Sequence, residues 1–412
     1  MELIKRTTLK SLTADQPLSV VQQFGQRCAE NIDLEHLNLF LVFTWISLVF
    51  YVLDIVIELY WLIHFFSRNY YWCFGCTLAF WIIPVVLLYF RSVSLRNERK
   101  ETYDPRDLLS KEESDFRWAM KWAGPFCPIP RYWDIIKYGL NAKQAKKTDD
   151  DKQSNYLVTM IWEEAELLQL HQFDYFMESA VHLSLHFYVT AINGSQFGGL
   201  TAICLFISVL SLSWAIVSYD QKICLLKGII KSDEQNQSNG SINFEADDAI
   251  DCIKNIDWRK STRIFFAHFS LIVGRLIAFT LLGSKDGSLI WPLSLVWPFS
   301  LNRFVNMFNW HRKRNYNFMD SLRLAFLHVF AYLYPLEKAS DKLKHPRLQP
   351  GEFKINWISE NLFLMLLWSH SFFECDEWTK RIISSYYPWS DWTFFVPWIG
   401  QIFASVLTFV LF

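Results

Sequence analysis

The stretch LNLFLVFTWISLVFYVLDIVIELYWLIHF, residues 38–66, decides the fold class. It is apolar over almost its whole length, and an α-helix needs about 20 such residues to cross the ~30 Å hydrocarbon core of a bilayer. Comparable runs recur along the 412-residue chain, which is 52% hydrophobic and 17% aromatic and therefore too apolar for a typical soluble domain. The sequence predicts an all-α polytopic membrane protein.

Eight transmembrane helices are predicted, together with two segments that are expected to be re-entrant or half-inserted. The first such segment, 118–140, carries Pro125, Pro128 and Pro130, which cannot all occupy one regular helix. The second covers 318–336. The predicted spans are 38–66, 70–92, 165–192, 199–219, 264–284, 288–309, 355–373 and 389–412.

The order of these elements repeats, which predicts a bundle of two pseudo-symmetric halves, 38–222 and 261–412. The first half includes a loop at 96–155, and the two halves are joined by a flexible loop at 223–260. Lys and Arg concentrate in these loops and after the sixth span. Because positively charged loops stay on the cytosolic side, we expect the N-terminal segment 1–37, the long loops and the C-terminus to be cytosolic.

Net charge and cysteine content indicate little further chemistry. A net charge of −1 gives no indication of nucleic-acid binding, and none is expected. The start of the chain lacks the apolar stretch of a signal peptide. The eight cysteines lack a disulfide-framework spacing, and the pair Cys73 and Cys76 lies in an apolar run, where packing is the expected role.

Ionisable residues recur inside the predicted spans, where a charge at the bilayer centre costs at least ~2.5–3.5 kcal/mol. In the third span, acids and histidines follow one another at intervals of four residues. On a helix of ~3.6 residues per turn they form a slowly winding stripe, which must face protein or water rather than lipid. The row is Asp174, Glu178, His182 and His186; the other spans contribute Asp54, Glu58, His268, Arg275 and Glu360.

Three interpretations of these residues remain open. Acids of the first and third spans could neutralise Arg275 and hold the bundle together. The excess of acids, with two histidines in a ladder, fits a polar furrow across the membrane better. His182 and His186 could also bind a metal with Glu178 as a third ligand or general base. His268 is the one obvious further ligand, so no metal or other cofactor is expected.

Several motifs resemble those of the XK-related family. Asp174 and the run Glu178-Ser179-Ala180 are similar to the family's E-x-x-x-E-S-A-P-Q-L-x-x-Q helix, with histidines replacing both glutamines. Six more segments resemble family motifs and follow the same order along the chain. They are VLDIVIEL (52–59), LAFWIIP (78–84), GPFCPIPRYW (124–133), SLSWAIVSY (211–219), GRLIAFTLL (274–282) and SENLFLMLLW (359–368).

The resemblance implies a plasma-membrane protein that scrambles phospholipids without ATP, phosphatidylserine among them, as on dying cells. It also implies a partner, either a single-span immunoglobulin-type subunit or a lipid-transfer protein. The alternatives are a non-scrambling scaffold that docks such partners and, third, a metal-dependent membrane hydrolase or ion carrier. The motif D-A-I-D, ending at Asp251, has the form of a caspase site. The candidate lipid-path or gate residues are Asp54, Glu58, Asp174, Glu178, His182, His186, His268, Arg275 and Glu360.

Overall fold

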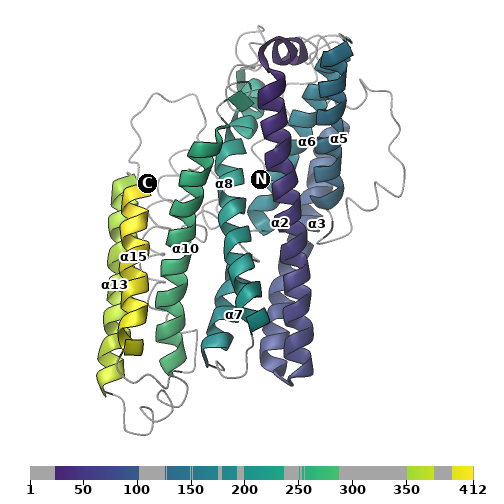
Figure 1. The fold of residues 1–412 in the computed structure, drawn as a ribbon. Helices are drawn as coiled ribbons and strands as arrows, with labels where there is room; N and C mark the ends of the chain where they lie inside the picture. Colours follow the sequence, from purple (N-terminus) through teal and green to yellow (C-terminus); the bar gives the residue numbers. More distant parts are fainter. Residues whose placement is uncertain are drawn as a thin grey trace.

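The described part of the protein is helical throughout and contains no strand (Figure 1). Three of its helices are long and apolar enough to cross a membrane, over Leu34–Ser67, Gly199–Tyr219 and Trp258–Leu281. This confirms the predicted all-α membrane architecture but leaves the number of spans open. The computed structural model describes residues 24–101, 126, 128–148, 150, 152–174, 179–192, 199–235, 250, 253–254, 256–286, 350–374 and 392–411.

The first predicted span and the tight turn after it are confirmed. Helix α2 (Leu34–Ser67) leads through Asn69, which has a φ of 61°, into helix α3 (Tyr71–Glu101). Asparagine tolerates this left-handed conformation better than most residues. The turn is closed by the Tyr70 amide, which donates to the Phe65 carbonyl at 2.9 Å. Helix α3 continues beyond the predicted end of the second span, through Pro84 to Glu101.

A helical hairpin replaces the predicted broken segment and linker. Helix α5 (Pro128–Thr148) and helix α6 (Gln153–Asp174) lie side by side near one end of α2 (Figure 1). Two of the three prolines sit in or near the first turn of α5, where a missing amide hydrogen removes no intrahelical bond. Residues 128–140 therefore belong to a regular helix, which was not expected. Pro125 lies outside the described residues.

Helix α5 begins part-way along α2. The ring of Tyr132 lies 6.2 Å from that of Tyr51, and Trp133 meets Trp45 edge-on at 6.3 Å. Further along α5, a Cβ on Gly139 would lie too close to a terminal methyl carbon of Leu41, so the two helices approach closely at this glycine. Helix α5 therefore runs antiparallel to the first half of α2, which fits an element that enters the membrane part-way.

The predicted third span, 165–192, is covered in part by two described helices. Helix α6 is described as far as Asp174, and helix α7 (Ala180–Ile192) packs against α3 and α10, whereas 175–178 lie outside the described residues. The apolar run that suggested one span starts in the middle of α6, which begins at Gln153. The buried acids of α6 have basic partners on α5 and α8, so this helix belongs to a packed unit of its own.

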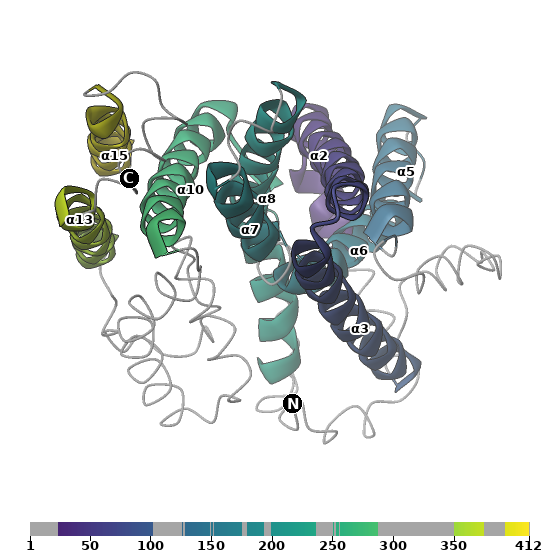
Figure 2. The same ribbon diagram turned by 90° about the horizontal axis from the view of Figure 1, so that it is seen from below.

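The remaining helices extend the bundle in one direction. Helix α8 (Gly199–Gln235) continues beyond the boundary expected at 222, and helix α10 (Trp258–Asp286) lies between it and the pair α13 (Pro350–Glu374) and α15 (Trp392–Leu411) (Figure 2). The predicted elements 288–309 and 318–336 lie outside the described residues. The fifth, seventh and eighth predicted spans coincide with α10, α13 and α15.

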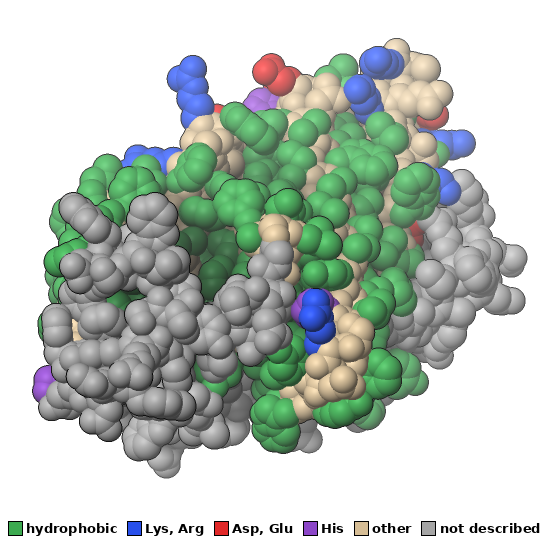
Figure 3. All heavy atoms as spheres, turned by 60° about the horizontal axis from the view of Figure 1, so that its bottom comes forward, with side chains coloured by type: hydrophobic (Ala, Val, Ile, Leu, Met, Phe, Trp, Pro, Cys, Tyr) green, Lys and Arg blue, Asp and Glu red, His purple; other side chains and the backbone are tan. Residues whose placement is uncertain are grey.

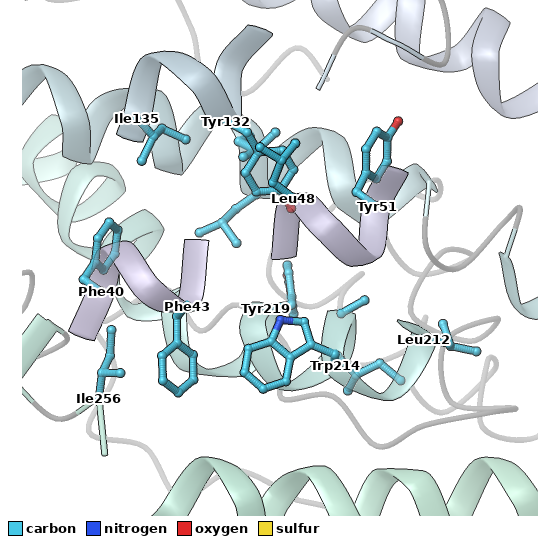
Figure 4. Packing of buried hydrophobic residues seen from close by; sticks show 14 of the residues in the cluster. Phe40, Phe43, Leu48, Tyr51, Tyr132, Ile135, Leu212, Trp214, Tyr219 and Ile256 are labelled. Atoms are coloured by element: carbon cyan, nitrogen blue, oxygen red, sulfur yellow. The ribbon is translucent and has the colours of Figure 1, made fainter. Parts of the chain in front are cut away.

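The core between α2, α5 and α8 is aromatic (Figure 4). Trp214 packs its ring 5.1 Å from Phe43 and donates its indole N–H to Ser47 at 3.0 Å. Ser47 in turn bonds Ser218 at 3.1 Å, so the buried polar atoms of this region satisfy one another. Hydrophobic side chains also cover most of the described surface in Figure 3, whereas charged ones gather toward one edge of that view. Such an outer surface suits a protein surrounded by lipid.

Candidate functional site

Three helices meet at what we call the α2–α3–α7 junction, formed by Glu58, Thr77 and His182 with Asp54 and Ser179 beside them. Glu58, His182 and Asp54 were predicted from the sequence, whereas Thr77 was not. The imidazole Nδ1 of His182 lies 3.0 Å from Oε1 of Glu58. Its Nε2 lies 3.0 Å from the backbone carbonyl oxygen of Thr77. Both side chains are buried, so His182 fixes α7 to α2 and α3 at once.

Asp54 lies one helical turn before Glu58 and has a different environment. Its carboxylate accepts a 2.7 Å hydrogen bond from the Ser179 hydroxyl, which stands directly before α7. Asp54 is only half-buried, and its neighbours Val52 and Val56 are exposed on the outer face of α2. The junction therefore presents an acidic, hydrogen-bonding edge to the surroundings of the bundle.

The predicted row is described only at its two histidines. His186 stacks on Trp61 with ring centroids 4.3 Å apart and packs against Phe65 at 5.8 Å. It is buried among these aromatic side chains. The side chain of Asp174 and the whole of Glu178 lie outside the described residues. The continuous stripe therefore stays a prediction, whose described members are His182 at the junction and the aromatic-packed His186.

A second buried arrangement, which we call the α10–α13 lock, consists of Arg275, Glu360 and Asn361. One terminal nitrogen of Arg275 donates to Glu360 at 2.6 Å and the other donates to Asn361 at 2.8 Å. The guanidinium also lies 5.4 Å from the Phe279 ring centroid, within cation–π range. Arg275 is 0% exposed. The acid that pairs with it in the described residues is on α13, whereas the sequence analysis considered acids of the first and third predicted spans as its partners. His268 is buried on the same helix.

A third arrangement, the α5–α6–α8 charge cluster, was missed in the sequence. Arg131 pairs with Glu166 at 2.6 Å and lies 4.0 Å from Glu163. Lys222 pairs with Glu164 at 2.7 Å, and all five side chains are buried. The signal was present as E-E-x-E at 163–166, at the start of the predicted third span, but these acids were not singled out. The basic partners of these acids, Arg131 and Lys222, are identified only by the packing of α5 and α8 against α6.

Comparison with known proteins finds a family resemblance over the first part of the chain. The family model described as XK-related protein matches residues 42–233. Over this region the chain is similar to the XK-related family. No curated protein matches the chain. The matched region runs from α2 to α8, so it contains both the junction and the charge cluster, whereas the α10–α13 lock lies beyond it.

Two further expectations concern a metal and a protease. No group of three or more His, Cys, Asp or Glu side chains that could hold a metal occurs among the described residues of the protein. Glu178, the expected third ligand, is not among them. Asp251 also lies outside the description, but Ile250 and Ile253 beside it are buried in the core. Cleavage after Asp251 stays a prediction that the described residues do not test.

Proposed function

We propose that this protein is an ATP-independent phospholipid scramblase, for which the α2–α3–α7 junction lines part of the lipid path. The observation that carries the proposal is the half-buried carboxylate of Asp54 on the outer edge of the bundle. A charged side chain at membrane depth is costly, and such residues commonly mark substrate pathways. Similarity to the XK-related family supports the same activity.

The depth of Asp54 supports this role. Aromatic residues prefer the membrane–water interfaces, and α2 has the exposed Trp45 toward one end and the exposed Tyr71 just past the other. Arg68 is the C-cap residue of α2 and lies shortly before Tyr71. At the helical rise of ~1.5 Å per residue, Trp45 and Arg68 lie ~35 Å apart along α2, close to the thickness of the hydrocarbon core. On the same scale Asp54 lies ~14 Å from Trp45, near the middle. A polar edge at this depth lowers the cost of moving a headgroup through hydrocarbon.

The charge of this edge indicates which part of a headgroup it would meet. The Asp54 carboxylate can attract the amine of choline, ethanolamine or serine headgroups, phosphatidylserine included. Arg275 is fully enclosed by the α10–α13 lock, so it offers phosphate no accessible nitrogen. We therefore assign the junction to the amine and treat the lock as scaffold.

Orientation and partners complete the proposal. Both termini lie in the cytosol of a plasma-membrane protein, because Lys and Arg concentrate in the loops on that side. A single-span immunoglobulin-type subunit or a lipid-transfer protein is the partner class that the family suggests.

Reconstitution tests the proposed activity directly. Purified protein is placed in liposomes with a fluorescent phospholipid in both leaflets, without ATP or calcium, and a membrane-impermeant reductant then bleaches the outer leaflet. We expect the protected inner-leaflet signal to be lost with protein and kept in protein-free liposomes. Retention of the signal with folded protein would contradict the proposal and favour the scaffold.

A further inference from the structure

The hydrogen bonds of His182 determine where its protons lie. The Thr77 carbonyl oxygen can only accept a hydrogen bond, so the Nε2 atom that faces it at 3.0 Å must carry a hydrogen. A neutral imidazole with that hydrogen has a lone pair at Nδ1 and can only accept there. An ionised Glu58 carboxylate can also only accept. The 3.0 Å contact between Nδ1 and Glu58 is therefore a hydrogen bond only if one more proton lies between them.

We propose that the α2–α3–α7 junction is a proton-binding site in which Glu58 and His182 hold one proton between them and the pair has no net charge. The proton resides either on Nδ1, as an imidazolium facing a carboxylate, or on Glu58, as a carboxylic acid that donates to Nδ1. Both forms have the same proton count and the same two hydrogen bonds. The inference needs no lipid movement and stands independently of the scramblase proposal.

Burial makes this proton count the favourable one. The side chains of His182 and Glu58 are 2% and 7% exposed, so an uncompensated negative charge between these helices would be expensive. Among the described residues, no Lys or Arg forms an ion pair with Glu58. The His182 ring also contacts the rings of Phe80 and His186. The proton is thus the available counter-charge.

The role of the proton is to connect three helices. His182 lies in the first turn of α7. Its Nε2 bonds the backbone of α3, and its Nδ1 bonds Glu58 of α2. Neither bond involves a salt bridge to an arginine, in contrast to the α10–α13 lock. Removing the proton would place two acceptors against each other in a buried site and separate α7 from α2.

Nitrogen-15 magnetic resonance of histidine-labelled protein in lipid nanodiscs at neutral pH tests the proposal. We expect the His182 Nε2 resonance in the protonated range and Nδ1 either protonated or accepting a strong hydrogen bond. In E58Q, the glutamine amide can donate to a neutral ring, so Nδ1 should move fully into the unprotonated range while Nε2 stays protonated. An unprotonated Nε2 in the wild-type protein would overturn the proposal.

Paired substitutions test the neutrality of the site without spectroscopy. H182F leaves the Glu58 carboxyl buried without a partner, and we expect the ratio of unfolded to folded protein to rise roughly 100-fold or more. The double variant E58L/H182F removes both polar groups and should recover most of that loss. E58Q keeps both hydrogen bonds and should unfold nearly as the wild type does. Additive losses in the double variant would contradict a mutually compensated pair.

Discussion

The α10–α13 lock and the α2–α3–α7 junction both place ionisable groups between apolar helices, but they complete those groups in different ways. In the lock, Arg275 is entirely enclosed and bonds both Glu360 and Asn361. At the junction, Glu58 has a histidine as its partner and Asp54 remains half-exposed with a hydroxyl donor. The lock is closed on all sides, whereas the junction has an open edge.

This difference separates scaffold from candidate site. A buried charge with a complete set of partners fixes two helices relative to each other, and the loss of one partner is strongly destabilising. A half-exposed acid contributes less to holding helices together, so its presence at mid-membrane calls for another role. Substitutions in the two regions should therefore have opposite profiles, with large losses of stability at the lock and losses of transport at the junction.

The largest expected effect is at the lock. R275M leaves Glu360 buried without its base, and we expect it to destabilise the protein by about 3–5 kcal/mol. Denaturant unfolding in detergent measures this loss, and R275K, which keeps the charge, should lose less. An R275M variant as stable as the wild type would show that the lock is dispensable.

The α5–α6–α8 charge cluster should behave like the lock. K222M leaves Glu164 without its 2.7 Å partner, and a loss of about 3 kcal/mol is expected in the same unfolding measurement. The double variant K222M/E164Q removes the stranded charge and should regain part of the loss. If the double variant were no more stable than K222M, Lys222 would act through its packing on Phe40, 4.9 Å from the ring centroid, rather than through charge.

These first two cases show what the sequence could and could not predict. The long apolar run predicted α2, and Asp54, Glu58 and Arg275 stood out because charge is rare in such runs. The partners of Arg275 and Lys222 were not predictable, because Glu360 lies 85 positions from the arginine and Glu164 lies 58 from the lysine. Periodicity describes one helix at a time and says nothing about which helix packs against it.

The start of α6 at Gln153 was missed for a related reason. An apolar run predicts a span wherever charges are few, and the run at 165–192 satisfied that condition. Glu164 and Glu166, at the border of this run, form ion pairs with α8 and α5 in the folded protein, and α6 extends back to Gln153 as part of a hairpin. The pattern predicted that Glu58 and His182 are intramembrane groups, but their contact exists only through the packing of α7 on α2.

A smaller effect is expected from close packing beside the lock. A Cβ on Gly274 would lie 2.7 Å from a ring atom of Trp357, so G274A should cost about 1–3 kcal/mol of stability by overpacking. Gly75 of α3 is the matched control, because nothing lies within 4 Å of its added Cβ. G75A should be neutral or slightly stabilising. Equal melting temperatures for the two variants would contradict the tight contact between α10 and α13.

The smallest effect concerns a thiol near the start of the described chain. Burial raises the pKa of the Cys28 thiol to about 12, and a maleimide reacts with the thiolate. At pH 8 only about one molecule in 10,000 would be ionised at this position, so we expect Cys28 to remain unlabelled in the folded protein and to react after denaturation. Mass spectrometry of labelled peptides measures this. Rapid labelling of the native protein would show that the helix over 24–31 does not stay packed.

The most direct test of the central claim compares D54N with D33N in the liposome assay. Asp33 stands at the N-cap position of α2 without a side-chain capping hydrogen bond, and its side chain is 72% exposed, so D33N repeats the same chemical change beside the same helix away from the junction. We expect D54N to slow the loss of the inner-leaflet signal of a choline or ethanolamine lipid several-fold while its unfolding midpoint stays unchanged, and D33N to scramble as the wild type does. Equal rates in D54N, D33N and the wild type would contradict a lipid path along the α2–α3–α7 junction.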